Sequence, residues 1–385
     1  MHTFKVSSTG ITAKYEEEQV LHYILRFTIF ALMLCVISMG MTSFSADVHA
    51  VSIHNHAPSQ QENQHPSNVA LPRTHAQAAA LVDVTSGRVL FSENGDTPLP
   101  MASTTKIMTA ILAIEQGNLN DKVKTSNRAY GKEGSSIYLH LGEVMTLKHL
   151  LYGLMLRSGN DAATAIAEHI GGSEEGFVFL MNEKAAELGL EHTQFRNPHG
   201  LDAEGHYTSA IDLAKLSAYA LRNSTFREIV KTKQIAVPNP NDKWNYSWSN
   251  KNKMLRFYEG ADGVKTGYTT VAHRCLVSSA TRNGQQLTAV TLNDGNDWLD
   301  HEKMLNYGFV TYPLRTLVKA KQVIEGYPFQ AERDVQYPLT DAEQGEISYK
   351  VKIHAPLSLE YRLGRRAIVE VYWHDQKLAT VPLKE

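Results

Sequence analysis

The spacing of hydrophobic positions changes about two thirds of the way along the chain. Before Gly260, apolar residues recur at helical spacing, as in the stripe over 147–155. Beyond it, the apolar runs become shorter, and the runs 275–280 and 287–292 flank Asn283-Gly284, a strong signal for a two-residue β-turn. The pattern therefore predicts helices packed with antiparallel strands, rather than an all-helical or all-β chain.

A β-hairpin followed by a buried helix is predicted near the start of the folded part. The apolar runs 79–84 and 88–91 flank a Thr-Ser-Gly turn. The helix over 107–115 can begin only after Pro100, because the residue before a proline is pushed away from helical geometry. Ser103 then falls at the helix start as a capping or first-turn residue. Since the helix is apolar almost all round, we expect it inside a domain.

Further helices are predicted over 177–188, 209–220 and 300–309. After them the chain becomes strand-like and rich in turns, with strict alternation of apolar and polar residues over 347–353. Residues 313–385 therefore read as a small C-terminal all-β domain.

Composition excludes several classes of protein. The chain has 385 residues, 43% of them hydrophobic, which is enough for two domains with their own cores. The formal net charge of -2 gives no overall basic field, so nucleic acid is not an expected partner. Cys35 and Cys275 are the only cysteines, so the fold does not depend on a disulfide framework.

The N-terminus carries an export signal. Arg26 precedes an apolar run over 27–41, which is shorter than the roughly 20 residues of a membrane-spanning helix. A small-residue cleavage site ends at Ala50, so residues 1–50 are predicted as the signal peptide region and Val51 as the first mature residue. The protein is thus expected at the outer face of the cell membrane, in the wall, or secreted. The alternative is an uncleaved anchor, and only then would the protein associate with a membrane.

Residues 51–75 are rich in His, Asn, Gln, Pro and Ser, which predicts a disordered linker. His54 and His56 have no cysteine or carboxylate at a fixed spacing, so no metal site is predicted there. His199 and His206 could suggest a Ser-His-Asp triad, but no G-x-S-x-G elbow accompanies them.

Three short motifs carry the candidate chemistry: Ser103-Thr104-Thr105-Lys106, Ser158-Gly159-Asn160 and Lys265-Thr266-Gly267. Ser103 and Lys106 are three residues apart and share one face of a helix, where a neutral lysine can take the serine proton. Lysine is neutral at pH 7 only when it is desolvated or near another cation, which Lys265 could supply. Each motif alone is weak. Together, at a helix start, an inter-helix connection and a strand edge, they predict a serine acyl-transfer site without histidine, metal or cofactor.

The same motif set marks class A β-lactamases and penicillin-binding proteins. The chain resembles the low-molecular-mass penicillin-binding proteins, specifically the serine-type D-Ala-D-Ala carboxypeptidases, from about residue 78 to residue 309. The segments that carry the resemblance are 82–90, 100–109, 156–163, 197–202 and 206–210. Ser-Gly-Asn in place of Ser-Asp-Asn fits the carboxypeptidases better than class A β-lactamases. The resemblance implies a β-lactamase/transpeptidase-like α/β (α+β) domain over 76–312, an antiparallel sheet flanked by helices with a helical subdomain.

The resemblance also implies catalytic roles. Ser103 would attack the carbonyl between two D-alanines and form an acyl-enzyme. Lys106 would be the base for acylation, and Ser158 would relay a proton to the leaving amine. The backbone N–H groups of Ser103 and Tyr268 would form the oxyanion hole.

Substrate-binding roles are implied in the same way. Asn160 would hold the substrate peptide chain, while Lys265 and Thr266 would bind the terminal carboxylate. Gly267 lets a backbone come close. The expected partners are peptidoglycan stem peptides, with β-lactams as covalent inhibitors.

Two other functions stay open at this point. A β-lactamase would need an extra glutamate for deacylation, and the spacing of Glu168, Glu174 and Glu175 does not place any of them over Ser103. A β-lactam-sensing or wall-binding protein would acylate and stop. Turnover of a D-Ala-D-Ala peptide separates the carboxypeptidase from both.

Overall fold

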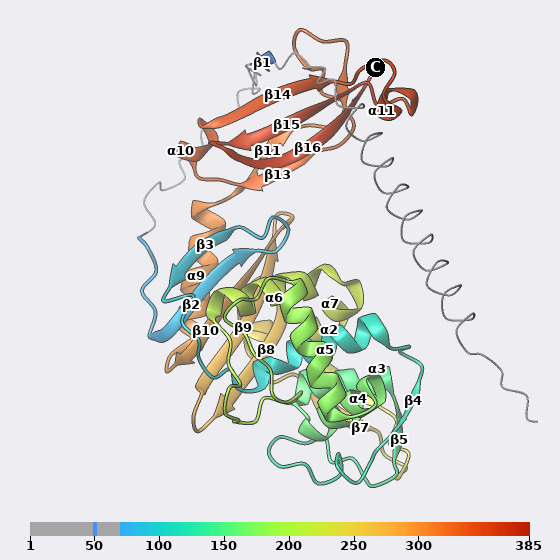
Figure 1. The fold of residues 1–385 in the computed structure, drawn as a ribbon. Helices are drawn as coiled ribbons and strands as arrows, with labels where there is room; N and C mark the ends of the chain where they lie inside the picture. The colour runs from blue at the N-terminus through green and yellow to red at the C-terminus, as the bar shows by residue number, and fades with distance from the viewer. Residues whose placement is uncertain (1–48, 52–69) are drawn as a thin grey trace, which may run out of the picture.

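The computed structural model describes residues 49–51 and 70–385 (Figure 1). The predicted signal-peptide core and most of the predicted linker lie outside the described residues. His49–Val51 form strand β1, which spans the predicted cleavage site after Ala50. No helix in the described part of the chain is long and apolar enough to cross a membrane.

Contacts with the folded domain begin within the segment predicted as linker. The Thr74 hydroxyl donates to Glu93 Oε2 at 2.6 Å. The backbone N–H of His75 donates to Asp300 Oδ2, also at 2.6 Å. The chain is therefore held by polar contacts just before the first strand of the central sheet.

The first domain is built around a five-stranded antiparallel sheet with the strand order β3-β2-β10-β9-β8. The strands are β2 (Ala76–Asp83), β3 (Val89–Glu93), β8 (Ala261–Thr269), β9 (His273–Arg282) and β10 (Gln285–Asp294). Both predicted hairpins are confirmed, since β2 pairs with β3 and β9 pairs with β10. Asn283 and Gly284 take φ angles of 49° and 80°, as their turn requires. Strand β8 lies at the sheet edge.

Helices cover both faces of this sheet (Figure 1). Helix α6 (Ala210–Arg222) packs on β2 and β10, and α9 (Asp297–Thr311) packs on β9 and β10. The helix predicted over 209–220 is present as α6, and it is capped at its start, because the Ser209 hydroxyl accepts from the N–H of Asp212 at 3.1 Å.

A helical region completes the first domain. Its helices are α2 (Lys106–Gln116), α3 (Leu147–Tyr152), α4 (Asn160–Gly171), α5 (Glu174–Glu187), α7 (Ser224–Lys231) and α8 (Met254–Phe257). Two short hairpins that the sequence did not predict join it: β4 (Lys122–Lys124) with β5 (Val144–Thr146), and β6 (Gln234–Val237) with β7 (Tyr246–Ser249).

Helix α2 lies inside this domain, as its composition predicts. Every residue from 106 to 113 is buried, and Ile107, Ile111 and Leu112 are 0% exposed. Burying each of these side chains stabilises the fold by about 1.5–3 kcal/mol. The same burial removes Lys106, the first residue of α2, from water.

The C-terminal region is all-β apart from two single-turn helices. Its larger sheet has the order β1-β14-β15-β16-β12, and β11 pairs with β13 in a second sheet. The elements are β11 (Leu314–Val318), β12 (Gln330–Ala331), β13 (Val335–Pro338), α10 (Asp341–Gln344), β14 (Ile347–Ile353), α11 (Leu359–Arg362), β15 (Ala367–Trp373) and β16 (Gln376–Lys384). Val351, Val369 and Val381 belong to a core cluster separate from those of the first domain. The predicted fold class is confirmed in both regions.

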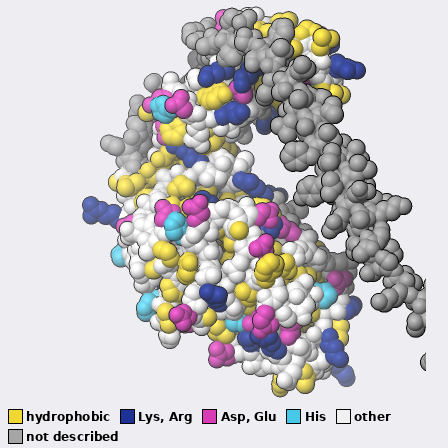
Figure 2. Space-filling model, in the orientation of Figure 1, with side chains coloured by type: hydrophobic (Ala, Val, Ile, Leu, Met, Phe, Trp, Pro, Cys, Tyr) yellow, Lys and Arg dark blue, Asp and Glu magenta, His cyan; other side chains and the backbone are white. Residues whose placement is uncertain are grey.

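One arginine joins the two regions. Arg88, in the turn between β2 and β3, donates to the carbonyl of Pro338 at 2.6 Å and pairs with Glu343 at 2.5 Å. Its guanidinium lies 4.6 Å from the ring centroid of Trp373. On the described surface in view in Figure 2, basic and acidic side chains are interspersed, in keeping with a net charge near zero.

Candidate active site

The first motif lies where a 3₁₀ turn runs into α2. Ser103 belongs to the turn η1 (Ala102–Thr105), and Lys106 is the first residue of α2. A 3₁₀ turn has three residues per turn, so residues three apart lie directly over one another. Lys106 Nζ is accordingly 3.0 Å from Ser103 Oγ. The predicted pairing of these side chains is present, in a tighter turn than the α-helical one expected.

Two carbonyl oxygens fix the orientation of the Lys106 amine. Its Nζ lies 2.7 Å from Asn160 Oδ1 and 2.5 Å from the backbone oxygen of His199. Both oxygens can only accept, so each takes one N–H of the amine. A neutral amine has two N–H groups and one lone pair. In that neutral form the lone pair faces the Ser103 hydroxyl, which can donate, whereas in the charged form the third N–H donates to Ser103 Oγ.

Burial and neighbouring positive charges favour the neutral form of the Lys106 amine. Lys106 and Lys265 are 0% and 1% exposed. Burial, followed by the charges of Lys265 and Lys251, lowers the pKa of Lys106 well below its usual value, and only Asp161 opposes this. Burial and the charge of Lys251 lower the pKa of Lys265 to about 7. Neither buried lysine forms an ion pair with a carboxylate in the described residues.

The second motif connects two buried helices, as predicted. A π-helical turn, η2 (Gly153–Arg157), ends at Ser158, which takes the left-handed conformation with φ 67° and ψ 33°. Such a conformation is strained for a residue other than glycine and is common at functional sites. Ser158 is 4% exposed, and within the described chain its hydroxyl has no hydrogen bond. Asn160 opens α4, and its Nδ2 donates to the carbonyl of Glu133 at 2.7 Å.

The third motif lies on the edge strand β8 and abuts the first motif. Lys265 Nζ donates to the carbonyl of Thr266 at 2.8 Å. A Cβ atom at Gly267 would lie 3.1 Å from both the Cβ of Ala102 and the backbone nitrogen of Ser103. A side chain there would press on the turn η1, so glycine permits the close approach of strand and turn. Tyr268, the next residue, is 64% exposed.

His199 and His206 have structural contacts at the edge of the site. His199 reaches Lys106 only through its backbone oxygen. His206 Nδ1 accepts from the N–H of Arg196 at 2.9 Å, so its Nε2–H donates to Thr105 Oγ1 at 2.8 Å. Burial lowers the pKa of His206 to about 4, which keeps the ring neutral. No hydrogen bond joins either ring to Ser103 in the part of the chain that the structure describes.

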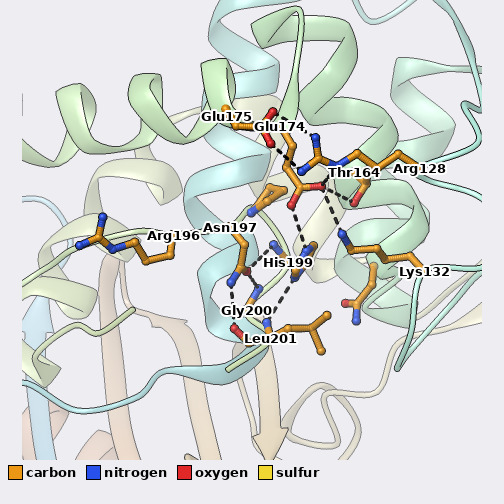
Figure 3. Close-up of polar contacts among 12 residues, drawn as sticks. Arg128, Lys132, Thr164, Glu174, Glu175, Arg196, Asn197, His199, Gly200 and Leu201 are labelled. Atoms are coloured by element: carbon orange, nitrogen blue, oxygen red, sulfur yellow. Dashed lines mark hydrogen bonds and ion pairs between the residues drawn. The ribbon is translucent and has the colours of Figure 1, made fainter. Parts of the chain in front are cut away.

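The three candidate glutamates are engaged elsewhere. Glu168 accepts from Ser126 Oγ at 2.6 Å, and Glu175 pairs with Arg128 at 2.7 Å. Glu174 lies beside His199, with 3.4 Å between Glu174 Oε1 and His199 Nε2 (Figure 3). Among the described residues, no carboxylate forms a hydrogen bond with Ser103.

Two groups that contribute to the site belong to none of the three sequence motifs. The first is Lys251, which donates to Ser135 Oγ at 3.1 Å and whose charge acts on both buried lysines. The second is the backbone oxygen of His199. Gly200 has φ 84°, and a Cβ atom there would lie 2.0 Å from the oxygen of Ala102. The glycine of the Asn-Pro-His-Gly segment therefore lets this loop pass against the turn η1. That glycine is the sequence feature that could have indicated the role of the His199 oxygen.

A serine hydroxyl beside a buried lysine that has no carboxylate partner is compatible with serine acyl-transfer chemistry. The family model described as D-alanyl-D-alanine carboxypeptidase matches residues 62–296. D-alanyl-D-alanine carboxypeptidase DacF of Bacillus subtilis is 36% identical over 80% of this chain and 85% of its own. A D-alanyl-D-alanine carboxypeptidase of a Streptomyces species is 37% identical over 58% of this chain and 84% of its own.

Solved structures agree with these relatives. Penicillin binding protein 5 from Haemophilus influenzae superposes with a TM-score of 0.67 at 28% identity, over 82% of this chain and 98% of that one. The chain belongs to the D-alanyl-D-alanine carboxypeptidase family of serine peptidases. The predicted family, fold and class of hydrolase are confirmed.

Proposed function

We propose that the protein removes the terminal D-alanine from peptidoglycan pentapeptides through an acyl-enzyme on Ser103, with Lys106 as the base. The observation that carries this proposal is the geometry of Lys106. Two carbonyl acceptors occupy the N–H groups of its amine, and the remaining direction points to Ser103 Oγ at 3.0 Å. In a chain of this family, that geometry allows Lys106 to take the proton of Ser103 during acylation.

Acylation begins with a proton transfer. The Ser103 proton moves to Lys106 Nζ as Ser103 Oγ bonds to the carbonyl carbon of the penultimate D-alanine. Negative charge then develops on the substrate oxygen, where the N–H groups of Ser103 and Tyr268 would stabilise it. The close approach that Gly267 permits between β8 and the Ser103 nitrogen supports this pairing of donors.

Collapse of the tetrahedral intermediate expels D-alanine. The C–N bond breaks, and the leaving nitrogen takes a proton that Ser158 would relay from Lys106. Lys265 and Thr266 would bind the carboxylate of the leaving residue, and Asn160 the peptide chain. Water then attacks the acyl-enzyme, its proton returns through the same groups, and Ser103 is regenerated.

We propose that the reaction takes place outside the cytoplasm, because the leader predicted over residues 1–50 would export the chain. We further propose that residues 1–50 direct export and that cleavage leaves Val51 first, with 76–312 as the catalytic domain and 313–385 as the C-terminal domain. N-terminal sequencing of protein from the envelope fraction tests the leader. A start at Met1 would show a retained anchor instead.

A turnover experiment tests the activity. The exported protein is incubated with a pentapeptide muropeptide and followed by mass spectrometry. We expect many D-alanines released per enzyme, long-lived labelling by penicillin at one per Ser103, and loss of both in Ser103→Ala with little change in melting temperature. Labelling that persists in Ser103→Ala would place the nucleophile elsewhere.

The same experiment separates the other functions. Rapid penicillin hydrolysis would indicate a β-lactamase, and a single burst with both ligands would indicate a sensor. Neither is favoured, because the relatives are carboxypeptidases and because Glu168, Glu174 and Glu175 are each engaged by other side chains.

A further inference from the structure

A buried glutamate lies behind the lysine of the site. Glu174, the first residue of α5, is 6% exposed. Its carboxylate faces Thr164 Oγ1 at 3.2 Å, Lys132 Nζ at 3.3 Å and His199 Nε2 at 3.4 Å (Figure 3). Burial by itself raises the pKa of Glu174, but His199 and the charges of Lys132 and Arg128 lower it to about 2. The side chain is therefore an anion at neutral pH.

One arm of this cluster leads from Glu174 to Lys106 through His199. The N–H of Leu201 donates to His199 Nδ1 at 3.3 Å, so the ring proton lies on Nε2, which is 3.4 Å from Glu174 Oε1 and forms no hydrogen bond within the described residues. The backbone oxygen of the same residue accepts from Lys106 Nζ. The Glu174 carboxylate therefore packs against the ring of the same residue whose backbone oxygen is the first acceptor of the amine.

A second arm reaches the other acceptor. Lys132, paired with Glu174, directly precedes Glu133, whose carbonyl accepts from Asn160 Nδ2 at 2.7 Å. This bond determines which end of the Asn160 amide faces inward. With Nδ2 bound to Glu133, Oδ1 faces Lys106 Nζ at 2.7 Å.

We propose that Glu174 is a positioning residue, whose single carboxylate holds both carbonyl acceptors of Lys106 so that the amine lone pair faces Ser103. The inference rests on the proposed role of Lys106 as the base. Outer partners of this kind matter because misplacing a reacting group by about 1 Å can cost roughly 100-fold in rate.

The neighbouring glutamate offers a matched control. Glu175 belongs to the same helix turn and pairs with Arg128, which also lies 3.4 Å from Glu174. Its side chain is 69% exposed. Glu175 has no bond to His199 or Lys132. Removing Glu175 takes away one negative charge, as removing Glu174 does, but leaves the contacts with His199 and Lys132 in place.

The test compares Glu174→Ala, Glu174→Gln and Glu175→Ala in stopped-flow acylation by a chromogenic β-lactam. It separates the non-covalent dissociation constant from the limiting acylation rate. For Glu174→Ala we expect the limiting rate to fall by about 10-fold or more, with the dissociation constant within about two-fold. Glu174→Gln should regain only part of the rate, because its amide oxygen can still accept from Thr164 and Lys132 while its NH2 group would face the N–H of His199. Glu175→Ala should match the wild type.

A wild-type limiting rate in folded Glu174→Ala would overturn the proposal, as would a change confined to the dissociation constant. If Glu174→Ala does not fold, Lys132→Ala decides, since it cuts only the second arm. A slower limiting rate there supports the proposal, and an unchanged rate overturns it. If Lys106→Arg acylates normally, the base assignment itself fails. If Lys106→Arg is inactive and Glu174→Ala is not impaired, only the positioning role fails.

Discussion

The two regions of the molecule treat buried charge in opposite ways. In the C-terminal region, Glu370 is 3% exposed, and it is surrounded by Lys352 at 2.8 Å, Lys377 at 3.3 Å and the hydroxyl of Tyr372 at 2.8 Å. In the catalytic region, Lys106 and Lys265 are equally buried, and their described hydrogen-bond partners are neutral oxygens.

This difference in partners distinguishes Glu370, whose charge stabilises the fold, from the two lysines, whose protonation state can change. Burial tends to raise the pKa of Glu370, but its three donors lower it to about 2, so the carboxylate stays ionised and stabilises the sheet. The lysines lack such partners, so burial lowers their pKa values and makes a neutral amine available. A buried ionisable group left without a counter-ion is thus the better indicator of function.

The largest expected effect comes from the same substitution made in both regions. Arginine keeps the charge of lysine but does not lose its proton at any working pH. Lys106→Arg should therefore lose penicillin acylation and D-alanine release almost completely. Lys352→Arg should keep its ion pair with Glu370 and retain wild-type activity and stability.

Acylation kinetics and melting temperatures of the two variants check this contrast. A Lys106→Arg enzyme that is folded and active would show that the buried lysine is structural, like Glu370.

A plot of kcat/KM against pH should fall on both sides of a maximum, on the acid side because of Lys106 and on the basic side because of Lys265. Because the folded-state pKa of Lys106 is lowered, its amine is neutral above that value, and acylation falls as the pH drops through it. Lys265 is charged below about pH 7, so carboxylate binding weakens as the pH rises past that point in the free enzyme. Steady-state rates on a D-Ala-D-Ala peptide across the pH range test this. A flat profile around pH 7 would contradict the assignment of Lys265.

A smaller effect is expected at Glu370. Its folded-state pKa of about 2 lies below the ordinary 4.5, so its stabilising contribution is complete above pH 4.5 and is lost as the pH falls towards 2. Glu370→Gln should lower stability by about 1–3 kcal/mol at neutral pH, since charged hydrogen bonds are replaced. Thermal unfolding at neutral and acidic pH should show the deficit shrinking with acidity, while acylation at room temperature stays normal. A deficit independent of pH would mean that packing, not charge, is responsible.

Local rules predicted much of the fold. Asn283-Gly284 predicted the β9–β10 hairpin because its backbone adopts positive φ at little cost. Pro100 predicted where the nucleophile helix could begin, and the structure starts its 3₁₀ turn at Ala102. The motifs predicted the pairing of Ser103 with Lys106 because that pairing depends only on a spacing of three.

What the sequence did not predict depends on tertiary contacts. The His199 oxygen is a backbone atom 93 positions from Lys106, and any residue type could supply it. Ser158 takes a left-handed conformation against its own preference, because helices on either side hold it. Three-residue strands such as β4 and β5 are too short to show a period of two. Lys251 belongs to no motif and acts through its charge.

The most direct test of the account is the ionisation of Lys106 in the folded enzyme. Its Nζ resonance can be followed by NMR in protein labelled with ¹⁵N-lysine and assigned by its absence in Lys106→Arg. The account predicts an amine that is neutral over the pH range in which acylation is fast and that takes up a proton over the range in which acylation is lost. An amine that stays charged well above pH 7, in an enzyme that acylates normally at pH 7, would contradict the assignment of Lys106 as the base.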